Sequence, residues 1–98
     1  MVSKENLLLL LKEFKWEWDL AEAIAWMLEE SDDIPQDSID GTYEILKNVI
    51  LKIRNKEAYE NFKSARDNLQ KVLMDENTEN KAILKDLDDL ENKLDELF

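Results

Sequence analysis

Apolar residues recur along this chain at alternating steps of four and three, the spacing of a helix that packs against near-parallel neighbours. Four segments each carry such a line of apolar residues, which we call the seam of the segment. The seams consist of Leu7, Leu11, Phe14, Trp18, Ala21, Ala25 and Leu28; Ile39, Tyr43, Leu46, Ile50 and Ile53; Ala58, Phe62, Ala65, Leu69 and Val72; and Ile83, Leu87, Leu90, Leu94 and Leu97. We therefore predict an all-α fold, an antiparallel four-helix bundle in which residues 1–98 form a single domain. The predicted core is Leu11, Phe14, Trp18, Leu46, Ile50, Phe62, Leu69, Leu87, Leu90 and Leu94.

Polar residues between the seams predict where the helices begin. The stretch SDDIPQDS, residues 31–38, is the clearest loop. The step from Ile53 to Ala58 is five residues instead of three or four. This irregular step favours a junction between two helices near Asn55 over one bent helix. The candidate N-cap residues are Ser3, Asp37 or Ser38, and Asn77 or Thr78.

The stretch FKWEWD, residues 14–19, alternates aromatic and charged residues as a strand would. Phe14 and Trp18 belong to the helical seam, so we favour one long first helix that runs through this stretch. Asp19 and Glu22 resemble a capping box, and the alternative is therefore a first helix broken near Asp19.

The first helix carries more apolar residues than its seam uses. These are Leu9, Trp16, Leu20, Ile24, Trp26 and Met27. In a continuous helix Trp16 lies roughly opposite the seam, because successive residues turn by about 100°. Trp is common at binding hot spots, so we predict a partner-binding surface here, with packing inside the protein as the alternative for both indoles. Homodimerisation through the first helix is a variant of this prediction.

Charge is distributed unevenly along the chain, whose net charge is −11. Residues 29–44 hold seven acids and no base, whereas residues 45–74 hold seven bases and three acids, a net charge of +4. The acidic faces include Asp32 and Asp33 in the loop and Asp86 and Asp89 in the last helix, and we add these four to the predicted partner-binding residues. The overall negative charge argues against nucleic acid as the partner.

The chain has neither cysteine nor histidine. Disulfides, thiolate and imidazole metal ligands and a histidine general base are therefore excluded. Carboxylate pairs such as Glu57 and Glu60 could hold Mg²⁺, but such pairs are typical of a solvated helix face. We predict no cofactor, no metal and no catalysis, and an enzyme ranks third among the functions considered.

Two further alternatives use charge alone. The basic third segment, with Tyr59 and Phe62 among its lysines and arginines, could bind nucleic acid within a larger assembly. Conversely, regularly spaced carboxylates could mimic a phosphate backbone and occupy a nucleic-acid-binding groove on another protein.

The stretch TYEILKNVILKIRNKEAYENF, residues 42–62, is similar in rhythm to the central helices of the bacteriocin immunity proteins of Gram-positive bacteria. It covers 21 of 98 residues and holds no diagnostic motif. The likeness implies an antiparallel four-helix bundle, although those proteins are often basic and this chain is acidic. By size and charge the chain also resembles small phage inhibitors, including anti-CRISPR proteins.

The apolar run Leu7–Leu11 is too short for a membrane span or a signal-peptide core, so we expect a soluble, cytoplasmic protein. The function predicted from the sequence is that of a small acidic, non-enzymatic protein-binding module. We expect an inhibitor, immunity-type protein or adaptor that acts by occluding a protein partner.

Overall fold

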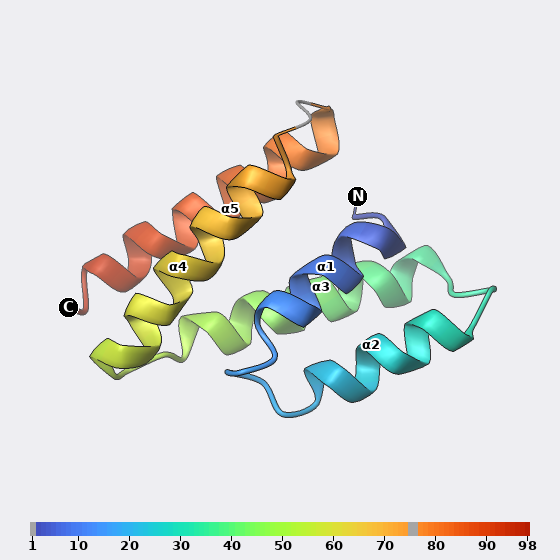
Figure 1. Ribbon diagram of the computed structural model, residues 1–98, viewed down its shortest axis with the longest axis horizontal. Helices are drawn as coiled ribbons and strands as arrows, with labels where there is room; N and C mark the ends of the chain where they lie inside the picture. Colours follow the sequence, from blue (N-terminus) through green and yellow to red (C-terminus); the bar gives the residue numbers. More distant parts are fainter. Residues whose placement is uncertain (1, 75–76) are drawn as a thin grey trace. The chain divides into compact units, whose positions relative to one another are not determined.

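The computed structural model describes residues 2–74 and 77–98, which form five α-helices and no strand. The helices are α1 (Lys4–Glu13), α2 (Ala21–Glu30), α3 (Gln36–Leu51), α4 (Lys56–Val72) and α5 (Thr78–Asp95) (Figure 1). The all-α prediction is confirmed. The four-helix bundle is not confirmed, because the described residues form five helices. Two compact units divide the chain, residues 1–49 and 50–98, and a single domain for the whole chain stays a prediction.

The first predicted helix is broken, so the expectation of one continuous helix is wrong. α1 ends at Glu13 and α2 begins at Ala21. The alternative break near Asp19 is confirmed, but the residue that precedes α2 is Leu20, which makes no side-chain capping bond. A straight helix would hold Leu7 and Leu28 about 30 Å apart. The turn instead lets α2 run back along α1 (Figure 1), so that both halves of the seam are buried.

The first unit contains α1, α2 and most of α3, with successive helices running in opposite directions (Figure 1). Two polar contacts link α1 to α2: Lys12 Nζ lies 2.9 Å from a Glu29 carboxylate oxygen, and Lys4 Nζ donates to the Ser31 carbonyl at 2.8 Å. The seam residues of this unit are buried except Trp18, which is only half-buried. The prediction that Trp18 belongs to the core is therefore wrong, because it lies in the turn after α1 rather than on a helix face.

The second unit is built on the hairpin of α4 and α5. Its seam is buried as predicted except at Val72 and Leu97, which lie at or beyond the ends of their helices. The predicted junction near Asn55 is confirmed, and its side chain accepts a hydrogen bond from the Ala58 N–H at 2.7 Å. Arg66 of α4 holds α5 through Asp88, 2.8 Å away.

The predicted caps have mixed outcomes. Ser3 accepts from the Asn6 N–H at 3.2 Å and Asn77 accepts from the Asn80 N–H at 2.8 Å, so both are confirmed. Asp37 and Ser38 are wrong, because α3 already begins at Gln36 and both residues lie inside it. The helix starts earlier because Pro35 precedes it, with its carbonyl accepting the Ser38 N–H at 3.0 Å.

No helix within residues 2–74 and 77–98 is both long enough and apolar enough to cross a membrane.

Candidate protein-binding surface on α2

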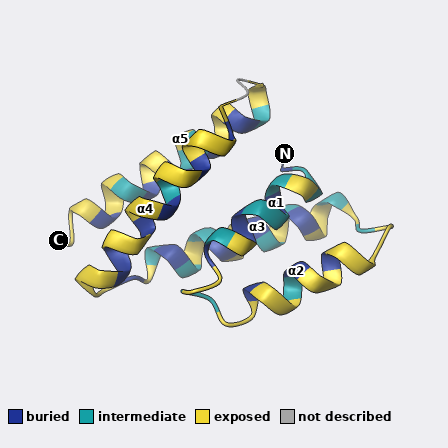
Figure 2. Ribbon diagram, viewed as in Figure 1, coloured by how far each residue is buried: buried dark blue, intermediate teal, exposed yellow. Residues whose placement is uncertain are grey.

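α2 buries one face and leaves large apolar side chains on the rest of its circumference. Ala21, Ala25 and Leu28 are buried. By contrast, Leu20 is 60% exposed, Met27 60% and Trp26 62%. Much of the surface of α2 is therefore exposed (Figure 2), although seven of its ten residues are apolar in type.

The exposed apolar residues lie on two flanks. At about 100° per residue, Leu20, Ile24 and Met27 form one line along the helix, whereas Trp26 lies on the opposite side of the outer surface. The first flank borders the segment that leads into α3, and the second borders α1. Leu20, Ile24 and Met27 thus lie in a line on one side of α2, whereas Leu9, which a continuous first helix would place in the same strip, lies on α1.

A groove with a volume of about 290 Å³ lies along the first flank, and we call it the α2–α3 groove. Its lining residues are Ile24, Met27 and Leu28 from α2, Ser31 and Ile34 from the connection, and Ser38 and Thr42 from α3. One wall is aliphatic and the other consists of small hydroxyl side chains. Such a surface can receive apolar side chains of another molecule, because the small side chains of Ser38 and Thr42 on the α3 side do not fill the groove.

The chain segment that forms the α2–α3 groove is rich in carboxylates. Residues 21–44 hold eight acids and no base. Three of the eight already have a partner: Glu29 pairs with Lys12, Glu44 with Lys47, and Asp40 accepts from Gln36. The remaining five make no ion pair with any residue in the described ranges, and they are Glu22, Glu30, Asp32, Asp33 and Asp37.

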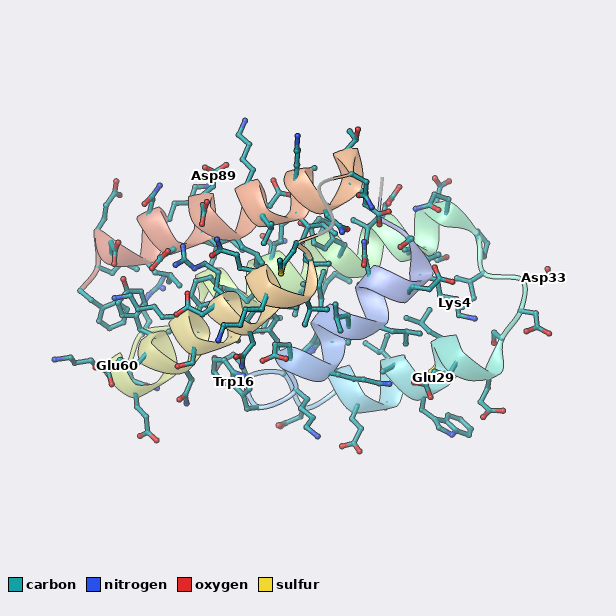
Figure 3. The ribbon with its side chains drawn as sticks, turned by 45° about the horizontal axis from the view of Figure 1, so that its top comes forward. Lys4, Trp16, Glu29, Asp33, Glu60 and Asp89 are labelled. Carbon is teal, nitrogen blue, oxygen red and sulfur yellow. The ribbon has the colours of Figure 1, made fainter. Side chains whose placement is uncertain are left out.

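Asp32 and Asp33 lie between two lining residues of the groove, Ser31 and Ile34. Both are exposed, and the Asp33 side chain projects from the outer end of the connection between α2 and α3 (Figure 3). These two predicted carboxylates therefore lie in the connection that contributes Ser31 and Ile34 to the lining of the groove.

The opposite flank of α2 has a different character. Trp26 borders a hollow of about 350 Å³ whose other lining residues include Lys12, Lys15, Glu22 and Glu29. The Lys12–Glu29 ion pair crosses this flank from α1 to α2. This ion pair neutralises two of the charges on the flank within the chain. The flank therefore has less unpaired charge for an outside partner to contact than the groove side has.

Trp16 lies in the turn between α1 and α2 and not on a helix face (Figure 3). Its indole N–H donates to the Glu13 carbonyl at 2.9 Å, and its ring centroid lies 6.2 Å from that of Phe14. The side chain is still 39% exposed. Trp16 thus has contacts within the chain, and its predicted role in partner binding stays a prediction.

Three other predicted residues lie outside the groove. Leu9 is half-buried on α1 and does not line it. Asp86 and Asp89 belong to α5 in the second unit, where Asp86 is half-buried with an interaction of its own and Asp89 is exposed. Their predicted roles stay predictions.

Sequence reasoning missed Ile34, Ser38 and Thr42 as parts of this surface. Ile34 had a usable signal, since it is an isolated aliphatic residue within a polar loop and directly precedes Pro35. Ser38 and Thr42 had none, because hydroxyl residues one helical turn apart are ordinary on a solvated helix face.

The basic strip of α4 is partly occupied within the chain. Arg66 pairs with Asp67, Asp88 and Glu91, and Lys63 lies 4.9 Å above the Tyr59 ring. Tyr59 and Phe62 are buried, so neither ring is presented for stacking on a base. In the described residues no group of three or more carboxylates is arranged to hold a metal ion.

Comparisons of the chain with protein-family models, with curated proteins and with solved structures found no match.

Proposed function

We propose that this chain is a non-enzymatic protein-binding module that contacts its partner through the outer surface of α2. The observation that supports the proposal most is that α2 buries one face, while Trp26 and Met27 within it and Leu20 directly before it are each at least 60% exposed. Single exposed apolar residues are normal on soluble proteins. Here they gather on or directly before one helix, and Met27 lines the α2–α3 groove; such clusters are typical of interaction sites.

The expected action is occlusion of a partner, as an inhibitor, immunity-type protein or adaptor would do. The antiparallel arrangement of successive helices in the first unit supports such a role, because it presents α2 on a framework held by the Lys12–Glu29 and Lys4–Ser31 contacts. A site carried on a stable helix needs little reordering on binding, which lowers the entropic cost of association.

Site-specific photo-cross-linking in the native cells tests this proposal. A benzophenone amino acid replaces Ala23, an exposed residue on the outer surface of α2, and in a matched control it replaces Gln70, an exposed residue of α4. We expect a protein cross-linked at position 23 and not at position 70, identified by mass spectrometry. Calorimetry with the two purified proteins should then show direct binding.

A second variant makes the test stricter. Met27→Lys in the Ala23 cross-linking chain should abolish the cross-link, whereas Val72→Lys should leave it intact. Met27 and Val72 are almost equally exposed, at 60% and 59%, and the two changes add the same charge. Identical cross-linked proteins at positions 23 and 70, or none at position 23, would overturn the proposal.

A further inference from the structure

We infer that the element bound in the α2–α3 groove is a basic amphipathic helix of a partner protein. This inference rests on the proposed function and names the chemistry of the partner. It is carried by two properties of the same chain segment: an apolar groove between helices, and unpaired carboxylates next in sequence to residues that line it.

The shape of the groove favours a helix. It lies between α2 and the start of α3, which run in opposite directions (Figure 1). The line of Leu20, Ile24 and Met27 has the i, i+4, i+7 spacing with which one helix packs against another. On the α3 side of the groove, the small side chains of Ser38 and Thr42 leave room for a bound helix. Gly41 lies between them in the sequence, and a Cβ at this position would meet nothing within 4 Å. An amphipathic helix can therefore place its apolar residues against Met27 and Ile34.

The carboxylates near the groove indicate that the polar face of the bound helix carries basic side chains. Asp32 and Asp33 lie in the connection between two lining residues, and Asp37 directly precedes a third, Ser38. None of the three has an ion-pair partner among the residues that the structure describes. Lysine or arginine side chains that flank the apolar stripe of a bound helix would pair with them, and such complementarity raises the association rate and selects the partner.

The same charges argue against other occupants. In a symmetric dimer through this groove, the carboxylates of one copy would face those of the other. The basic helix α4 of a second copy is a poor substitute, because Val72, at 59%, is its only large apolar residue that is exposed. Nucleic acid and anionic lipid would be repelled by the unpaired carboxylates.

The probe for this inference is a synthetic helical peptide of about 14 residues, long enough for four turns. It contains only leucine and lysine, with the leucines spaced to form one apolar stripe. A second peptide replaces every lysine with glutamine, and a third scrambles the leucine and lysine order. Each carries a fluorophore, and fluorescence anisotropy gives its affinity for the full chain at low and at physiological salt.

We expect the leucine–lysine peptide to bind more tightly than both controls, with an affinity that falls as salt screens the carboxylates. Met27→Lys should lower that affinity at least about tenfold, since it removes an apolar contact and adds a repulsive charge. Val72→Lys adds the same charge on α4 and should change it less than about twofold. Replacing Asp32, Asp33 and Asp37 with asparagine should lower the affinity for the leucine–lysine peptide and leave the affinity for the glutamine peptide unchanged.

Two results would overturn the inference. If Met27→Lys and Val72→Lys weaken binding equally, the peptide is held by net charge and not by the groove. If the glutamine peptide binds as well as the lysine peptide, the partner helix is not selected by its basic side chains. The proposed function fails separately, when Ala23 gives no specific cross-link. A specific cross-link combined with either peptide result would retain a protein-binding α2 and reject the basic helix.

Discussion

The indole N–H of Trp16 donates a hydrogen bond to the backbone carbonyl of Glu13 over 2.9 Å. Glu13 is the last residue of α1, where helix carbonyls lack partners within the helix. The bond satisfies one of these carbonyls and sets the ring beside Phe14, which is fully buried. Trp16 thus stabilises the end of α1 at the point where the chain turns back.

Replacing Trp16 with phenylalanine should therefore destabilise the fold. We expect Trp16→Phe to lower the free energy of unfolding by about 1 kcal/mol, because the carbonyl loses its donor while most of the ring contact is kept. Trp26→Phe is the matched control, since Trp26 is 62% exposed, and it should change stability by less than about 0.5 kcal/mol. Urea unfolding followed by circular dichroism measures both. Equal effects would show that the Trp16 bond does not support the turn.

A second prediction concerns the ion pairs of Arg66 between α4 and α5. The side chain of Glu91 is 15% exposed, whereas that of Asp67 is 62% exposed. Glu91→Gln should lower the free energy of unfolding by about 1–2 kcal/mol, because it leaves a half-buried guanidinium with a weaker partner. Asp67→Asn should have an effect below about 0.5 kcal/mol, because exposed ion pairs contribute little. Thermal unfolding at two salt concentrations separates these outcomes, and a larger effect at Asp67 would contradict the ranking.

The acid dependence of stability should reflect two carboxylates of the first unit that act in opposite directions. A hydrogen bond from the Gln36 side chain and one from the Val2 N–H lower the pKa of Asp40 below its ordinary value of 3.8. Asp40 therefore stabilises the fold above that value, and this contribution is lost as pH falls through the lowered pKa. Burial raises the pKa of Glu17 above its ordinary value of 4.5. Glu17 therefore destabilises the fold once it is ionised, and the effect disappears as pH falls through its raised pKa.

Two amide substitutions test these signs. Asp40→Asn should lower stability at neutral pH and bring it closer to wild type in acid. Glu17→Gln should raise stability at neutral pH and lose that advantage in acid. Urea midpoints measured across the acid range give both profiles. A Glu17→Gln variant that is less stable than wild type at neutral pH would contradict the burial effect.

Gly41 lies inside α3, and a Cβ there would meet no atom within 4 Å. Gly41→Ala should raise the free energy of unfolding by about 0.5–1 kcal/mol, because alanine loses less conformational freedom in a helix. The reverse change at an exposed position of α5, Ala82→Gly, should lower it by a similar amount. Calorimetric unfolding compares the two, and a destabilising Gly41→Ala would indicate that residue 41 is not in a regular helix.

The seams were predictable from the sequence because helix periodicity is local. Ile39, Tyr43, Leu46, Ile50 and Ile53 recur at alternating steps of four and three, and all five are buried. The prediction failed at Val72, where α4 ends and the next residue, Leu73, is buried instead. A short-range pattern cannot show that the chain leaves its helical path at that point.

The candidate surface was only half predictable. Trp26 and Met27 stand out in the sequence as apolar residues outside the seam, and both are exposed. The α2–α3 groove also needs Ser38 and Thr42, which come from the next helix. No local pattern indicates that two hydroxyl residues lie opposite Met27 and Ile24.

The sequence by itself determined the helical class, the residues that face inward, and the acidic character of the segment from α2 to α3, since each follows from composition or from the 3.6-residue period. Only the tertiary structure decided that the first helix breaks after Glu13, that Trp16 bonds to the chain there, and that a groove opens beside Met27. The turn and the groove depend on contacts between residues far apart in the sequence, which form only when α2 folds back along α1 and α3 follows. The Trp16–Glu13 bond spans only three residues, but helical periodicity does not indicate it, because Trp16 lies in the turn after α1.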